Sequence, residues 1–87
     1  MPRQQLSYYQ GRYTVELQPG AAKDHLPTGS VNVSGNTVSV LRGTVQQVMG
    51  GIQFYADGKP FSWGYKFIRR IKDANGEVLW QNWDVKD

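Results

Sequence analysis

The sequence predicts an all-β fold, in which an antiparallel meander of about six strands forms a small closed or half-open barrel of SH3-like or OB-like size. Three observations support this prediction. Segments that alternate apolar and polar residues recur along the 87-residue chain, they are rich in β-branched and aromatic residues, and turn-forming residues separate them. The turns fall roughly every 8–15 residues, as in small barrels and sandwiches, and at most one short helical turn is expected.

The first predicted strand runs from Tyr8 to Leu17. Alternation places one set of its side chains inward, namely Tyr9, Tyr13, Val15 and Leu17, and the other outward, namely Arg12, Thr14 and Glu16. Gly11 interrupts the strand and predicts a bulge or a bend. The segment from Gln18 to Gly29 is expected to be irregular, because Pro27 limits any helix there to one turn.

A hairpin is predicted between Ser30 and Arg42, around a two-residue Gly35-Asn36 loop that suits a type II′ turn. This loop places four valines on one face by pairing Val33 with Val38 and Val31 with Val40. The following segment, 44–49, fits either a short helix or the end of a long strand. We favour the strand, because the glycines on both sides leave too few residues for a stable helix.

The next predicted hairpin, Ile52–Trp63, is built on Asp57-Gly58, a dipeptide typical of type I′ turns. This turn pairs Phe54 with Phe61 and Ile52 with Trp63. Pro60 has no amide donor, so its strand is expected at an edge of the sheet. Gly64 then allows the chain to bend into the last hairpin.

The last hairpin, Tyr65–Val85, organises the predicted fold, and two registers compete for it. A two-residue Asn75-Gly76 loop would pair Lys72 with Leu79 and Phe67 with Asp84. A three-residue loop over 74–76, with Gly76 left-handed, pairs Asp73 with Glu77 instead. It also gives these pairs: Ile71 with Leu79, Phe67 with Trp83, Tyr65 with Val85, Lys66 with Asp84 and Arg70 with Trp80. We predict the three-residue loop, because only this register gathers the apolar residues on one face.

In that register, the inner face of the last hairpin carries Tyr65, Phe67, Ile71, Leu79, Trp83 and Val85, with Arg69 and Gln81 as polar interruptions. The outer face carries Lys66, Ile68, Arg70, Lys72, Val78, Trp80, Asn82 and Asp84. The hairpin would therefore sort its rings inward and most of its cations outward. This sorting underlies the functional prediction below.

Composition limits the possible classes of protein. The 87 residues are expected to form one domain, 1–87, with a net charge of +3 and no cysteine, which excludes disulfides and Cys-rich zinc sites. The N-terminus lacks the apolar stretch of a signal peptide, and no apolar run approaches the roughly 20 residues of a membrane helix. We therefore expect a soluble, cytoplasmic protein that does not bind membranes and needs no cofactor or metal.

A set of basic and aromatic residues is the most informative candidate site. Lys66, Arg70 and Lys72 share the predicted outer face of the last hairpin with Trp80, and Arg69 lies at its inner edge. Tyr8, Arg12 and Lys59 extend this surface. Bases stack on aromatic rings while Lys and Arg hold phosphates, which is how small β-barrels bind single strands. The alternative interpretation is ordinary cross-strand packing, with Arg70 over Trp80 and Lys66 paired with Asp84.

Catalytic groups are few and scattered. His25 is the only histidine, and it follows Asp24 in the irregular segment, so we interpret it as a solvated loop residue. Glu16 and Asp84 lie in predicted strands, but nothing in their spacing favours a carboxylate pair. The glycines fall singly at turns and form no phosphate-binding motif. The sequence therefore argues against an enzyme.

Three functional hypotheses follow. The first is a non-catalytic binding module for single-stranded nucleic acid. The second is a protein-interaction or inhibitor module, encoded by a phage or another mobile element, and edge strands with exposed aromatics favour a homodimer as its variant. The third is a carrier that holds an apolar ligand in a barrel mouth among Tyr9, Tyr13, Trp63 and Trp83. We favour the first hypothesis.

Overall fold

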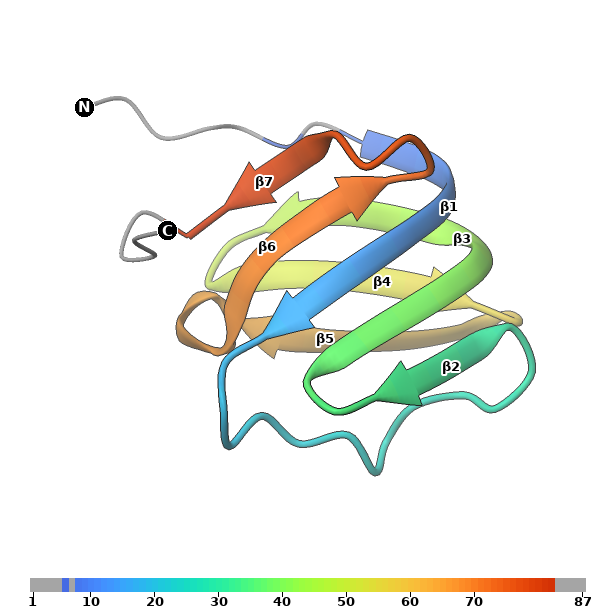
Figure 1. Ribbon diagram of the computed structural model, residues 1–87, viewed down its shortest axis with the longest axis horizontal. Helices are drawn as coiled ribbons and strands as arrows, with labels where there is room; N and C mark the ends of the chain where they lie inside the picture. The colour runs from blue at the N-terminus through green and yellow to red at the C-terminus, as the bar shows by residue number, and fades with distance from the viewer. Residues whose placement is uncertain (1–5, 7, 83–87) are drawn as a thin grey trace.

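The computed structural model describes residue 6 and residues 8–82, and its regular structure is almost entirely β-strand (Figure 1). Seven strands and one short 3₁₀ helix follow one another in this order: β1 Tyr8–Leu17, β2 Val31–Ser34, β3 Thr37–Val48, β4 Gly51–Ala56, β5 Lys59–Gly64, η1 Tyr65–Phe67, β6 Ile68–Asp73 and β7 Val78–Gln81. Residues 44–48 of the segment 44–49 belong to β3, so the predicted strand is correct there. No helix within the described residues is long and apolar enough to cross a membrane.

All seven strands belong to one antiparallel sheet that bends strongly but does not close, which confirms the predicted all-β, half-open architecture. Its order is β5-β4-β3-β1-β6-β7, and β2 pairs with β3 beside this path. The consecutive hairpins lie on either side of β1, which pairs with β3 on one edge and with β6 on the other. As Figure 1 shows, β1 therefore crosses the middle of the sheet and joins its two halves.

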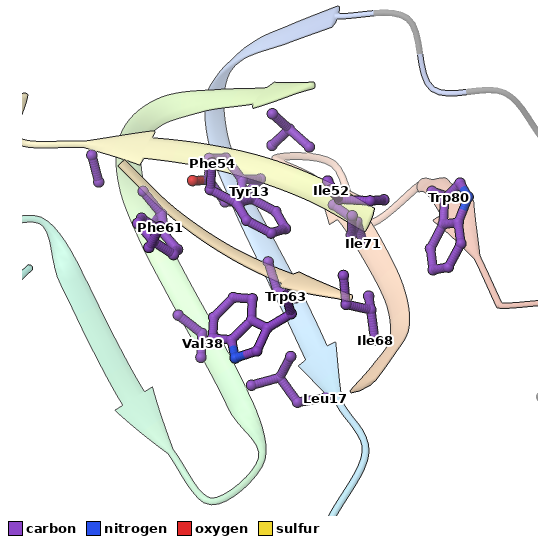
Figure 2. Packing of buried hydrophobic residues seen from close by; sticks show 14 of the residues in the cluster. Tyr13, Leu17, Val38, Ile52, Phe54, Phe61, Trp63, Ile68, Ile71 and Trp80 are labelled. Atoms are coloured by element: carbon purple, nitrogen blue, oxygen red, sulfur yellow. The ribbon is translucent and has the colours of Figure 1, made fainter. Parts of the chain in front are cut away.

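Aromatic rings form the centre of the core on the concave side of the sheet (Figure 2). Phe54 stacks on Tyr13 at 5.7 Å and on Phe61 at 5.3 Å between ring centroids, and Trp63 meets Phe54 edge-on. Each such ring removes about 150–250 Å² from water. This burial compensates for the small size of a chain that has no disulfide.

The two middle hairpins have the predicted registers. In β2–β3, Val31 pairs with Val40 and Val33 with Val38; Gly35 has a φ of 61°, as a type II′ turn requires. In β4–β5, Phe54 pairs with Phe61 and Ile52 with Trp63, and both turn residues have positive φ, as in type I′. The strand that contains Pro60 lies at an edge of the sheet, as predicted.

The last hairpin has the predicted loop, and Ile71, Arg70 and Lys72 have the predicted faces, but the outward faces predicted for Ile68, Trp80 and Asn82 are wrong. The Asp73 amide donates to the Glu77 carbonyl at 2.9 Å, and Gly76 has a φ of 85°. Beyond the loop, a bulge shifts the register, so that Ile71 pairs with Trp80 and not with Leu79. The bulge turns Trp80 inward, where it is 1% exposed.

A second correction concerns the start of this hairpin. Tyr65–Phe67 is a 3₁₀ helix, not a strand, and Ile68, which was predicted to point outward, is fully buried. Leu17 pairs with Ile68 while Glu16 pairs with Arg70, so Arg69 is the extra residue of a bulge in β6. The pairings predicted for Trp83, Asp84 and Val85 involve residues that lie outside the described ones.

Side chains of η1 and of the last strand bridge the open side of the sheet. The Tyr65 ring stacks on Trp80 at 5.6 Å, and its hydroxyl donates to the Val48 carbonyl at 2.8 Å. The buried Asn82 amide donates to the carbonyls of Tyr65 and Ile68 at 2.9 and 3.2 Å. These contacts replace backbone pairing between the edge strands β5 and β7.

Candidate functional site

The side of the sheet that points away from the aromatic core is called the outer face here. It carries the outward side chains of β1, β3, β4 and β6, and most of them are uncharged: Gln10, Thr14, Ser39, Thr44, Gln46 and Gln53. The register aligns the outward side chains in rows across neighbouring strands. One such row runs from Asn32 in β2 through Ser39 in β3 and Thr14 in β1 to Lys72 in β6. Against this polar background, the charged and aromatic side chains are the features that distinguish one part of the face from another.

Two arginines meet at a bulge in the middle of the outer face. Gly11 pairs with Gly43 and Tyr13 with Val40, so Arg12 in β1 lies opposite two residues of β3, Leu41 and Arg42. Both arginines are exposed, and neither forms an ion pair with any residue from 8 to 82. Gly11 was predicted to mark a bulge or a bend, and the register does shift there, but the extra residue lies opposite it in β3, which was not predicted. The bulge places two cations on neighbouring strands, and no acidic side chain among residues 8–82 forms an ion pair with either.

Arg70 and Lys72 also lie on the outer face, and they share a carboxylate. The Glu16 carboxylate in β1 forms ion pairs with Arg70 Nε at 3.4 Å and with Lys72 Nζ at 3.2 Å. Register places Glu16 opposite Arg70, which is why both cations can reach it. Among the described residues, this group holds two cationic side chains and one carboxylate. Half-exposed ion pairs of this kind contribute only about 0–1 kcal/mol to stability.

Two tyrosines are exposed on the same face. Tyr8 in β1 is 60% exposed, and Tyr55 in β4 is 44% exposed. Tyr8 lies opposite Gln46 and Tyr55 opposite Thr44, so the two rings occupy the two sides of β3. Sequence analysis had singled out Tyr8 but not Tyr55. Both rings have free faces that a planar ligand can contact.

Three of the predicted site residues lie elsewhere. Trp80 is buried beneath Tyr65, so its predicted place on the ligand-binding surface is wrong. Lys66 belongs to η1, where its ammonium lies 5.1 Å from the centroid of the Phe67 ring. Arg69 is the bulge residue of β6 and is half-buried. The structure therefore brings together four of the seven predicted residues: Tyr8, Arg12, Arg70 and Lys72.

A hollow of about 340 Å³, called the notch here, opens beside Arg42. It forms where β3 changes its partner along one edge, from β2 over 37–40 to β4 over 43–48. Its lining includes Ser30, Arg42, Gly43, Tyr55 and Asp57. The notch thus adjoins the outer face and shares Arg42 and Tyr55 with it.

Asp57 holds two walls of the notch together. Its carboxylate accepts the Ser30 amide at 2.6 Å and the Ser30 hydroxyl at 2.8 Å, and so links the β4–β5 turn to the start of β2. In Figure 1, these two segments lie at the same end of the molecule. Gly29 packs so closely that a Cβ there would lie 2.5 Å from a carboxylate oxygen.

The hydrogen bonds from Ser30 lower the pKa of Asp57 below its usual value. Because the folded-state pKa is the lower one, Asp57 stabilises the protein above the unfolded pKa of about 4, and this contribution is lost as pH falls through the folded pKa. We expect Asp57→Asn to flatten the decline of the urea midpoint as the pH falls below the unfolded pKa of about 4. Asp24→Asn, in an exposed loop, should leave this decline unchanged; equal profiles for wild type and Asp57→Asn would contradict the assignment.

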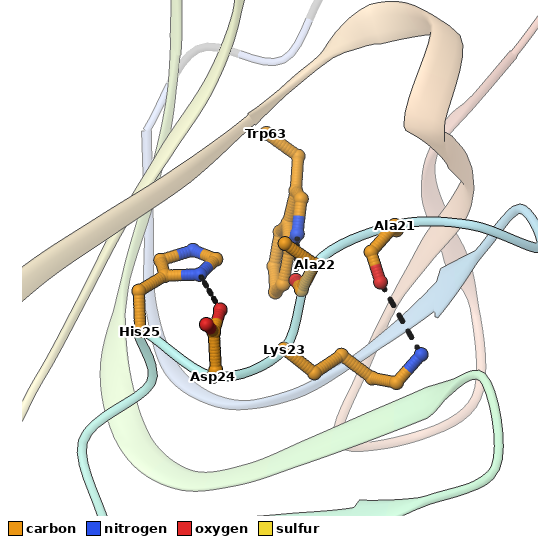
Figure 3. A network of polar contacts seen from close by, with 6 residues as sticks. All are labelled: Ala21, Ala22, Lys23, Asp24, His25 and Trp63. Carbon is orange, nitrogen blue, oxygen red and sulfur yellow. Dashed lines mark hydrogen bonds and ion pairs between the residues drawn. The ribbon is translucent and has the colours of Figure 1, made fainter.

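The irregular segment covers one end of the core (Figure 3). Trp63 Nε1 donates to the Ala22 carbonyl at 2.8 Å, and the His25 ring meets Trp63 edge-on at 5.5 Å between centroids. His25 thus packs on an aromatic ring as well as facing solvent. Of the four rings proposed to line a carrier cavity, Tyr13 and Trp63 are packed into the core, Tyr9 is partly buried against it, and Trp83 lies outside the described residues.

The chain matches no protein-family model, no curated protein and no solved structure. The candidate site therefore rests on its own geometry.

Proposed function

We propose that this protein is a non-catalytic module that binds single-stranded nucleic acid along its outer face. The observation that carries the proposal is the pair Arg12 and Arg42, which lie on adjacent strands without an ion pair to any of residues 8–82. Like charges on neighbouring strands repel one another, and an anion between them would remove that repulsion. A phosphate diester is such an anion, and a guanidinium binds it through two parallel hydrogen bonds.

The surroundings of the two arginines support a polymeric ligand. Arg70 and Lys72 continue the positive charge toward β6, and the exposed rings of Tyr8 and Tyr55 offer stacking surfaces. Stacking of a base on an aromatic ring contributes about 1–3 kcal/mol and tolerates any base. The hydroxyl and amide side chains between the rings can bond to sugars and phosphates without demanding a sequence.

Neutralising the two arginines should weaken binding and reduce its dependence on salt. A fluorescently labelled single strand of about 12 nucleotides suits a site of this size. Fluorescence anisotropy over a range of salt concentrations should give a log–log slope that is smaller by about 1.4 for Arg12→Gln/Arg42→Gln, since each phosphate contact on a single strand contributes about 0.7.

Lys23→Gln is the matched control, because Lys23 bonds to Ala21 and Asn36 at the end of the molecule, away from the two arginines. It removes one charge and should leave the slope nearly unchanged. Absence of binding by the wild-type protein at low salt would overturn the proposal. Equal slopes for wild type and the double variant would place any binding away from these arginines.

A second candidate is a protein-interaction module, and one observation favours it. Leu41 is 65% exposed at the same bulge, between the two arginines, and arginines around an exposed apolar side chain are common at protein interfaces. Leu41→Ala would then abolish the recovery of a stoichiometric partner in a nuclease-treated pull-down. The same substitution should have little effect on oligonucleotide affinity.

A further inference from the structure

The notch differs from the rest of the outer face in offering three kinds of contact at one place. Tyr55 supplies a partly exposed aromatic ring, Arg42 a guanidinium without an ion pair to any of residues 8–82, and Asp57 an exposed carboxylate. Gly43 adds only backbone to the lining, because a Cβ there would clash with the Tyr55 carbonyl oxygen. At about 340 Å³, it lies at the small end of the range of ligand sites, about 300–1,000 Å³.

The Asp57 carboxylate determines which hydrogen-bonding edge of a ligand would fit in the notch. Each Asp57 oxygen accepts one hydrogen bond from Ser30. The Gly29 amide also contributes a hydrogen bond that lowers the pKa of Asp57. A carboxylate offers about four acceptor positions in all, so Asp57 retains some capacity for a further donor. An ionised carboxylate accepts hydrogen bonds and donates none. A ligand in the notch should therefore present N–H groups toward Asp57, and two adjacent N–H groups would match its two oxygens.

We propose that the notch receives one base of the bound strand, with a preference for guanine. The inference rests on the proposed function and adds specificity to it. Guanine carries adjacent N–H donors, on N1 and on the exocyclic amine, that a carboxylate can accept together; the other bases lack this pair. The base stacks on Tyr55, and Arg42 holds the neighbouring phosphate. The outer face binds the strand, and the notch selects one position along it.

The test compares two labelled single strands, oligothymidine with and without one central guanine, by fluorescence anisotropy at one low salt concentration. We expect the wild-type protein to bind the guanine-containing strand about tenfold more tightly. This ratio corresponds to about 1.4 kcal/mol, which lies within the range of about 1–3 kcal/mol for a good base contact. Asp57→Asn should bring this ratio close to one. Asp24→Asn, which alters a distant carboxylate, should preserve the ratio.

Tyr55→Leu provides a second variant, because it leaves the Asp57–Ser30 bonds in place. It should weaken binding of the guanine strand about fivefold or more through lost stacking. Circular dichroism confirms that each variant is folded before affinities are compared. Equal affinity of the wild type for both strands would overturn the inference and leave the proposed function standing. Binding of neither strand would overturn both.

Discussion

Replacing Trp80 with alanine should lower the free energy of unfolding by about 3–5 kcal/mol, the usual cost of removing a fully buried tryptophan. Trp80 is 1% exposed and stacks on Tyr65 at the open side of the sheet. The deletion would leave a cavity and would also remove the support of Tyr65, which bonds to Val48. A domain of this size is stabilised by about 5–15 kcal/mol in total, so the loss would be a large fraction of its stability.

Urea unfolding followed by circular dichroism measures this change. Val78→Ala on the same strand is the control: Val78 is 38% exposed, and a surface substitution there should cost no more than about 0.5 kcal/mol. The comparison also tests the corrected register of β7. Had Trp80 pointed outward, its replacement would cost as little as that of Val78, and equal effects would overturn the bulged register.

Turn chemistry explains why so much of the fold was predictable from the sequence. A residue with positive φ closes each hairpin loop, and glycine or aspartate occupies those positions at Gly35, Asp57, Gly58 and Gly76. Once a two-residue loop is fixed, the register of the strands beside it follows from counting. The pairing of β2 with β3 and of β4 with β5 therefore agreed with prediction residue by residue.

Bulges explain why the remaining register was not predictable. Each bulge inserts one residue without a partner and so exchanges the faces of all residues beyond it. The bulges at Leu79 and Arg69 turn Trp80 and Ile68 inward, against the alternation that holds near the loop. A tertiary contact accompanies these bulges, because Trp80 packs against Tyr65. The alternation within one strand cannot predict a contact between two separate segments.

The candidate site was predictable only in part for the same reason. Alternation placed Arg12, Arg70 and Lys72 on the outer face correctly, although bulges lie beside them. Arg42 lies opposite Arg12 because of a bulge in β3. Tyr55 lines the notch because β3 changes its partner strand there. One local feature of the chain indicates the bulge that positions Arg42. Alternation breaks between Val40 and Gly43, where Leu41 and Arg42 are both exposed.

Replacing Gly43 with alanine should destabilise the protein by about 3 kcal/mol or more, the upper part of the range for overpacking. A Cβ at Gly43 would lie 2.1 Å from the Tyr55 carbonyl oxygen, so β3 and β4 would have to separate. This carbonyl belongs to the backbone and cannot rotate away as a side chain would. The strain would fall where Gly43 pairs with Gly11 on one side and with Ala56 on the other.

Gly64→Ala is the matched control, because a Cβ there would have only the Gly50 carbonyl oxygen nearby, at 3.7 Å, and φ is −68°. Alanine at position 64 should be neutral or stabilise the fold slightly, since it restricts the unfolded chain. Thermal and urea unfolding should therefore show that the two substitutions change the free energy of unfolding with opposite sign or by amounts that differ by several kcal/mol. A Gly43→Ala protein as stable as Gly64→Ala would mean that β3 and β4 do not approach as closely as the structure places them. The notch, which Gly43 and Tyr55 help to line, would then have a different shape.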